Sequence, residues 1–252
     1  MRSAKLLAFL IAAFAFGTVT SDRAGAAPHI ATFCIDASSP TATIEHRIAT
    51  AAGRAMGMHV TIASYDGSGG VSEGFFRFLA RTHCALIMGY PVDLLAPDPP
   101  DGLTLTRPYL ETGYVVAALK RPLTQRTIPH GTGVAIVTGT PPNFFLVGAL
   151  GPVPPYHADA YATPEGAIDA LVAHTDPAAM VWEPSVLRYR AAHPRAHIVT
   201  RPLAITHARW QFAALYNDHH RALGARFNTA ISTLTARGEL RRLTRSLHSE
   251  SL

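Results

Sequence analysis

The chain has 252 residues, of which 48% are hydrophobic and 15% are charged, and its formal net charge is +5. The basic residues are scattered along the chain, so the composition argues against a nucleic-acid-binding surface. The length suffices for one large domain or for two smaller ones, each with its own hydrophobic core.

The first 26 residues have the features of an export signal. Arg2 and Lys5 precede the apolar run LLAFLIAAFAF, and the small residues Ala24–Ala26 offer a cleavage site. The apolar run is too short for a permanent anchor, although an N-terminal membrane helix stays as the alternative. We therefore expect the mature chain to be periplasmic, with no membrane span after the signal is removed.

Short apolar runs alternate with segments of helical period between residues 29 and 102. Strands are predicted at residues 29–36, 59–66 and 84–91, and helices at residues 41–58 and 71–82. The first helix has an apolar face with a spacing of four, made of Ile44, Ile48, Ala52 and Met56. The Pro-rich segment 96–102 predicts a surface loop.

The alternation continues beyond residue 105. Residues 105–120, LTRPYLETGYVVAALK, predict a mostly buried extended strand in which Gly113 permits a bend. Residues 133–150 predict a strand, a turn and a helix, and residues 156–194 repeat that pattern twice. RWQFAALYN (209–217) predicts a return strand, and residues 219–247 predict one or two amphipathic helices. Two βα sets joined near residues 110–120 indicate an α/β protein with two lobes, and a plain edge strand in a single domain is the alternative.

Cys34 and Cys84 are the only cysteines. Each lies in an apolar run, IATFCID or HCALIMG. An exported pair favours a disulfide over a metal site or a catalytic thiol. Two buried thiols on neighbouring strands are the alternative, because sequence does not determine side-chain geometry.

These motifs resemble, in their order, those of the type II periplasmic solute-binding proteins, and in particular the family 3 group that is often paired with ABC importers. The resemblance rests on TRPYLETGYVVAALK as a crossing strand, on a first strand ending in Asp36, and on CALIMG, GVAIVTGT and AAMVWEPSVLRYRAAHP. It implies a two-lobed α/β fold with mostly parallel sheets, flanking helices and two hinge crossings. Residues 27–114 and 208–252 would form lobe 1, and residues 115–207 would form lobe 2.

A narrower resemblance is to binding-protein-like periplasmic proteins associated with PQQ-dependent alcohol dehydrogenases, including methanol oxidation systems. It is carried by Cys34, Cys84, Met88, Gly89, Pro91 and Thr106–Tyr109. The chain departs from that pattern at Ala85, where an aspartate is usual, and in its short ASSPTAT loop. This resemblance implies a protein partner in place of a solute.

Ligands of open α/β sheets bind outside the carboxyl ends of the strands. In lobe 1 this rule selects Asp36, Ser38, Gly89, Tyr90 and Arg107. In lobe 2 it selects Gly139, Thr140, Asn143, Trp182 and Glu183. The helix start after Gly139 offers free N–H groups to an anion. Tyr90 and Trp182 would clamp an apolar or planar group, and Glu183 would accept from an ammonium or a hydroxyl.

Several of these candidates also have a purely structural interpretation. Asp36 and Thr140 would cap helices. Trp182 would pack between the lobes, and Arg107 would brace a loop. In amino-acid-binding members of family 3, an arginine usually follows the third strand and grips the α-carboxylate. The corresponding turn here, YPVDLLAPDPP, has no basic residue, which argues against a standard amino-acid receptor.

Motifs for catalysis such as HExxH, G-x-S-x-G, a P-loop or Cys-x-x-Cys do not occur, and the 13 histidines are dispersed. We therefore expect no enzyme, no metal site and no cofactor, with a metal site built by distant histidines and a Glu183-centred acid as the open alternatives. The leading hypothesis is capture of a small solute for an ABC importer. The second is an accessory role in which the chain binds a periplasmic quinoprotein dehydrogenase.

Overall fold

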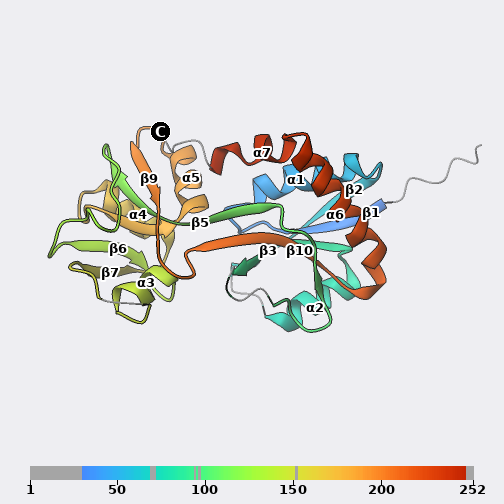
Figure 1. Cartoon of the computed structure of the whole chain (residues 1–252), viewed down its shortest axis with the longest axis horizontal. Helices are drawn as coiled ribbons and strands as arrows, with labels where there is room; N and C mark the ends of the chain where they lie inside the picture. Colours follow the sequence, from blue (N-terminus) through green and yellow to red (C-terminus); the bar gives the residue numbers. More distant parts are fainter. Residues whose placement is uncertain (1–29, 69–71, 94, 96–97, 151–152, 248–252) are drawn as a thin grey trace, which may run out of the picture.

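The computed structural model describes residues 30–68, 72–93, 95, 98–150 and 153–247. The predicted export signal, residues 1–26, lies outside the described residues. Figure 1 shows two lobes that lie side by side along the longest axis of the molecule. In the part of the chain that the structure describes, no helix has the length and apolar character needed to cross a membrane.

The first lobe starts with an alternation of strands and helices. It comprises β1 (Ile30–Asp36), α1 (Ala42–Ala55), β2 (His59–Tyr65), α2 (Glu73–Thr82) and β3 (Leu86–Asp93). β1 pairs in parallel with β2 on one side and with β3 on the other. The strands and helices predicted for this half are therefore confirmed, and the carboxyl ends of three parallel strands meet at one edge of the sheet.

The crossing strand β5 (Leu110–Leu119) belongs to both lobes, as Figure 1 shows. Its first residues pair antiparallel with β10 (Arg209–Tyr216) in the first lobe, and the short β4 (Thr104–Leu105) pairs with the end of β10. From Tyr114 onward, β5 pairs antiparallel with β8 (Ala179–Trp182) in the second lobe. The predicted crossing strand is thus confirmed.

Gly113 lies where β5 changes sheets. A Cβ atom at this position would lie 2.4 Å from the carbonyl oxygen of Ala208, and the Tyr114 N–H donates to that same oxygen at 2.8 Å. The two chain segments that join the lobes therefore run in backbone contact, and only glycine leaves room for them.

The described residues of the second lobe form strands that alternate with helices. They are β6 (Gly133–Val137), α3 (Pro141–Leu146), β7 (His157–Tyr161), α4 (Pro164–Val172), β8, α5 (Glu183–Ala192) and β9 (Ile198–Pro202). The strand order is β5-β8-β6-β7, with β6 parallel to β7 and β8, and β9 pairs with β5. The predicted strands and helices of this half are present.

The chain returns to the first lobe between β9 and β10. The prediction that RWQFAALYN itself forms the return crossing is wrong, because β10 pairs with β3 and with the first part of β5. The crossing is the preceding segment, residues 203–208, in which His207 adopts a left-handed φ of 61°. The boundaries of the lobes at residues 114–115 and 207–208 stay a prediction.

The last helices cover the first lobe. They are η1 (Asp218–His220), α6 (Arg221–Ala236), α7 (Glu239–Leu243) and η2 (Arg245–Leu247). α6 contacts α1, and η2 contacts α5 of the second lobe. The amphipathic helices predicted for the C-terminal part of the chain are confirmed.

Helices cover both faces of the first lobe's sheet. On one face, Phe33 and Leu86 pack with Ile48 of α1 and Phe227 of α6. On the other face, Ile87 and Leu215 pack with Phe76 and Leu79 of α2, next to Cys34 and Cys84. These two cysteines are disulfide-bonded and buried, with a Cα–Cα distance of 5.6 Å. The bridge links β1 to the residues just ahead of β3, inside the apolar layer beneath α2.

Candidate functional site

A cavity of about 450 Å³ lies between the two lobes. The first lobe contributes residues from the carboxyl ends of β1, β2 and β3, from α1 and α2, and from β10. The second lobe contributes residues at the starts of α4 and α5. The lining residues are Asp36, Ser38, Ser39, Pro40, Glu45, Tyr65, Phe76, Gly89, Pro91, Tyr114, Pro164, Trp182, Ser185, Trp210 and Phe212.

One wall of this cleft is aromatic. Trp182 of β8 packs edge-on against Tyr114 of β5, with ring centroids 5.1 Å apart. It also contacts Trp210 and Phe212 of β10, at 6.3 and 6.0 Å. The Trp210 Nε1–H donates to the His207 carbonyl at 2.7 Å. Both tryptophans of the chain therefore lie where the lobes meet, next to Tyr114 of β5 and the His207 carbonyl.

Asp36 lies at the carboxyl end of β1. Its Oδ1 accepts from the Ser38 N–H at 2.9 Å, from the Ser38 hydroxyl at 2.6 Å and from the Gly67 N–H at 2.9 Å. Asp36 therefore organises the turn that leads toward α1, and it places one carboxylate at the cleft.

Glu45 places a second carboxylate at the cleft, from the first turn of α1. Its side chain is fully buried. Oε1 accepts from the Thr41 hydroxyl, whereas Oε2 has no hydrogen-bond partner among the described residues. Burial raises the pKa of Glu45 to about 7; the Thr41 hydrogen bond lowers it in part, and the nearby Asp36 charge raises it further. A buried acid with an unsatisfied oxygen is costly to keep, which is typical of a functional position.

Gly89 of β3 makes room for the Glu45 carboxylate. Its φ is +78°, and a Cβ atom would lie 2.3 Å from Glu45 Oε2. The Gly89 N–H donates to the Tyr109 hydroxyl at 2.6 Å. Glycine is required at this position both by the left-handed backbone and by the carboxylate beside it.

Solved structures with a similar fold were found at low sequence identity. The L-cystine solute receptor of Neisseria gonorrhoeae, unliganded and open, has a TM-score of 0.69 and 16% identity over 86% of this chain and 92% of that one. The second substrate-binding domain of Lactococcus lactis GlnP, in an open conformation, has a TM-score of 0.67 and 14% identity over 86% and 94%. The GluR0 ligand-binding core of Nostoc punctiforme, in complex with L-glutamate, has a TM-score of 0.55 and 12% identity over 85% and 97%.

The chain has the type II periplasmic-binding-protein fold. Neither a protein-family model nor a curated protein matches the chain. With this fold, the cleft between the lobes lies at the position that the rule for open α/β sheets selects.

Four of the ten predicted site residues line the cleft of this binding-protein fold. They are Asp36, Ser38, Gly89 and Trp182. The packing between the lobes offered as the alternative for Trp182 is observed. The helix-capping role offered for Asp36 and Thr140 is wrong, because Asp36 holds a turn and neither α1 nor α3 has a side-chain hydrogen bond at its N-cap. Contact of these four residues with a ligand stays a prediction.

Two other candidates from the first lobe lie outside the cavity. Tyr90 packs edge-on against Phe76, with ring centroids 5.5 Å apart, and forms part of the layer beneath α2. Arg107 braces α6, because its N–H donates to Asn228 Oδ1 at 2.6 Å and its Nη1 donates to the Ser232 hydroxyl at 2.9 Å. This is the bracing role that the sequence offered as the alternative for Arg107.

Four candidates from the second lobe are also absent from the cavity lining. The Gly139 N–H donates to Asn143 Oδ1 at 3.1 Å, and the Thr140 hydroxyl donates to the Val137 carbonyl at 2.6 Å, so these three residues close the turn into α3. Glu183 accepts from the Thr112 hydroxyl at 3.1 Å, at the junction of the lobes. Burial raises the pKa of Glu183, while Thr112, Arg209 and Arg190 lower it.

Three further residues of the cleft, Glu45, Ser185 and the second tryptophan, Trp210, were not predicted from the sequence. The signal for Glu45 was present, because an acid between Ile44 and Ile48 lies next to the apolar, buried face of an amphipathic helix. An acid in a first turn is usually a partner of the helix dipole, so this position gave no warning of a site.

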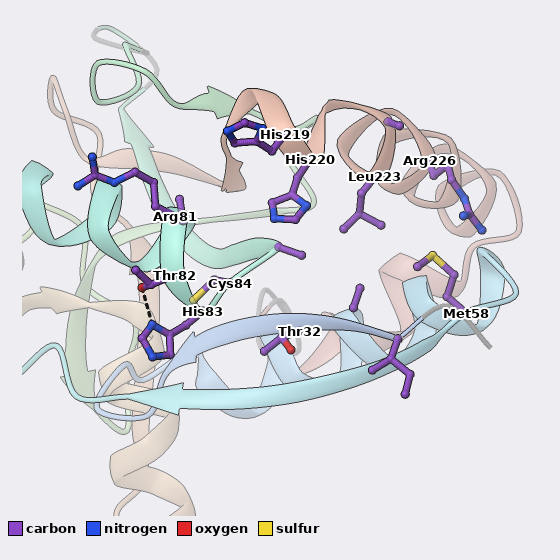
Figure 2. A pocket seen from close by; sticks show the side chains of 15 residues that line it. Thr32, Met58, Arg81, Thr82, His83, Cys84, His219, His220, Leu223 and Arg226 are labelled. Carbon is purple, nitrogen blue, oxygen red and sulfur yellow. Dashed lines mark hydrogen bonds between the residues drawn. The ribbon is translucent and has the colours of Figure 1, made fainter. Parts of the chain in front are cut away.

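A second hollow, of about 500 Å³, lies at the opposite end of the first lobe. Figure 2 shows it between the amino end of β1, the residues around Cys84 and the start of α6. It is lined by basic side chains, including Arg81, His83, His219 and Arg226, which are exposed. Thr82 is hydrogen-bonded to His83. This hollow is at the wrong end of the strands for a binding-protein ligand, and its polar side chains are open to solvent.

Proposed function

We propose that this chain is a periplasmic solute-binding protein that captures a small molecule between its two lobes and presents it to an ABC importer. The observation that carries the proposal is the interlobe cavity. It is lined from both lobes and contains a buried carboxylate oxygen, on Glu45, with no partner among the described residues. A cavity of about 450 Å³ is in the range of small-molecule sites.

The junction of the lobes supports a hinge. In the part of the chain that the structure describes, the segment around Gly113 and residues 203–208 join the lobes, and the two segments are in backbone contact. Two of the similar structures named above are described as open, and one of these as unliganded. A protein with short crossings and an open cleft is built to close around a ligand.

An importer is favoured by what similar structures are called, because one is an L-cystine solute receptor and another is the substrate-binding protein of an amino acid ABC transporter. A permease gene next to the gene for this chain is the expected genomic context. The accessory role beside a quinoprotein dehydrogenase rests on sequence resemblance alone, and no residue of the cleft favours it.

Thermal melting of the mature chain tests solute capture. The panel holds amino acids, organic acids, amines, alcohols and sugars. A solute at a hundred times its Kd adds about 2.7 kcal/mol, which raises the midpoint by roughly 5 to 10 °C for a chain of this size. Because both tryptophans line the cleft, the same solute is expected to change their fluorescence emission. A panel without any shift in midpoint or emission would contradict the proposal.

A further inference from the structure

The charged groups of the cleft are all of one sign. Among the lining residues, Asp36 and Glu45 are acidic and none is basic. Arg188 comes near the rim, where its Nη1 donates to the Ser38 carbonyl at 3.3 Å, but its charge is paired with Glu165. The residues that line the cavity therefore offer two carboxyl groups, and the arginine at the rim is already paired.

Helix N-termini on the second lobe do not offset this acidity. α4 and α5 both begin at the cleft, and a helix N-terminus ordinarily favours an anion. Both helices, however, have a proline in the first two positions, which removes an N–H donor, and both have a glutamate in the first turn. Glu165 and Glu183 already supply the negative charge that these helix ends favour.

Two residues that line the cavity, one from each lobe, each carry a covered polar atom that lacks a hydrogen-bond partner among the described residues. Glu45 Oε2 on the first lobe and the Ser185 hydroxyl on the second are both buried, and neither has a hydrogen-bond partner among the described residues. An unsatisfied buried oxygen costs free energy that a ligand donor would recover. A molecule that donates to Glu45 and reaches Ser185 would satisfy both groups and bridge the lobes.

The remaining lining favours an apolar body on the ligand. The aromatic side chains of Trp182, Trp210, Phe212, Tyr114 and Phe76 line the same cavity as the two carboxyl groups. Aromatic faces attract cations as well as apolar groups. A protonated amine with an apolar substituent matches both features of this lining.

We infer that the cleft selects organic ammonium ions with an apolar body, that Glu45 and Asp36 bind the ammonium group, and that solutes with a carboxylate are excluded. This inference rests on the proposed function, because it assigns a ligand class to the same cleft. The inferred ligand class differs from free amino acids. The α-carboxylate of an amino acid would lie next to Asp36 and Glu45, and no arginine lines the cavity to pair with it.

Binding is expected to depend on pH. The titratable groups around Glu45 are Asp36 from β1, Tyr65 from β2 and Tyr109 ahead of β5, and none of them is basic. With the pKa of Glu45 at about 7, its carboxyl is largely neutral at pH 6 and ionised at pH 8. A cation is therefore expected to bind about tenfold more weakly at pH 6 than at pH 8.

Titration calorimetry with a matched series tests the inference. Phenethylamine and hexylamine are apolar cations, L-phenylalanine adds a carboxylate to the first, and 3-phenylpropionate replaces the amine by a carboxylate. The amines are expected to bind and to change tryptophan emission. Their Kd values are expected to be at least about tenfold lower than those of L-phenylalanine and 3-phenylpropionate. Glu45→Gln is expected to raise Kd for the amines by about 10- to 100-fold, whereas Glu73→Gln, which changes an exposed side chain in the first turn of α2, leaves it unchanged.

Outcomes that overturn the inference differ from those that overturn solute capture. The ligand class is refuted, and solute capture stands, if L-phenylalanine or 3-phenylpropionate binds as tightly as the amines or more tightly. It is also refuted if Glu45→Gln leaves binding of the amines unchanged. The same holds if a different solute of the melting panel binds and neither amine does. If neither the series nor the panel binds, both proposals fall.

Discussion

A single residue of the cleft, Glu45, is expected to make the folding stability depend on pH. Its carboxyl is buried against Gly89 and near Asp36, so ionisation is unfavourable in the folded state, and its pKa rises from 4.5 to about 7. Between these two values the unfolded chain releases the proton that the folded protein retains. The contribution of Glu45 to stability is therefore greatest below pH 4.5 and is lost as the pH rises to about 7.

Glu45→Gln removes this pH dependence, because an amide fills the same space without a charge. A pKa displacement of this size corresponds to about 3 kcal/mol. We expect the variant to equal the wild type near pH 4.5 and to exceed it in free energy of unfolding by up to about 3 kcal/mol at pH 8. Urea unfolding at both pH values measures the difference, with Glu73→Gln as the control. Equal values for variant and wild type at pH 8 would contradict the burial argument.

Gly89 offers a second test beside the same carboxylate. Gly89→Ala has to bear a left-handed backbone and a clash with Glu45 Oε2, whereas Gly102→Ala, with φ +74° and no atom within 4 Å of the new Cβ, bears the backbone strain alone. We expect a loss of about 1 kcal/mol at Gly102 and at least about 2 kcal/mol at Gly89 in denaturant unfolding. Equal losses would mean that the carboxylate does not occupy the space at Gly89.

The disulfide between Cys34 and Cys84 is expected to stabilise the folded protein, because it links two segments of the first lobe. It joins β1 to the residues just ahead of β3 across a sequence separation of 50 residues. In the chain-entropy model, a loop of this length stabilises the folded state by about 4 kcal/mol. We expect the Cys34→Ala, Cys84→Ala double variant to unfold at correspondingly lower urea concentration, and intact mass to rise by about two hydrogens when the wild type is reduced. An unchanged mass on reduction would show that the thiols are free.

The two segments that join the lobes, β5 at Gly113 and residues 203–208, provide a further test. A Cβ on Gly113 would clash with the Ala208 carbonyl, which accepts from the Tyr114 N–H. Gly113→Ala is expected to push the two segments apart and to cost about 2 kcal/mol or more in thermal or urea unfolding. A variant as stable as the wild type would mean that the segments are not in fixed contact.

The fold of the whole molecule could be predicted from the sequence more completely than the site could. Strand and helix positions follow from hydrophobic period, and the order of motifs around residues 105–120 indicated two lobes. The return crossing was misplaced, because the apolar run of β10 does not reveal its pairing partners. At the site, the rule for sheet edges found Asp36, Gly89 and Trp182 but not Glu45, since it selects the ends of strands and not the inner face of a helix.

The most direct test of capture between two lobes is small-angle X-ray scattering of the mature chain with and without the solute that shifts its melting point most. The account predicts that the radius of gyration decreases at saturation, because the lobes rotate about Gly113 and residues 203–208 to enclose the solute. An unchanged radius of gyration, with tryptophan emission showing that the cleft is occupied, would contradict capture by closure.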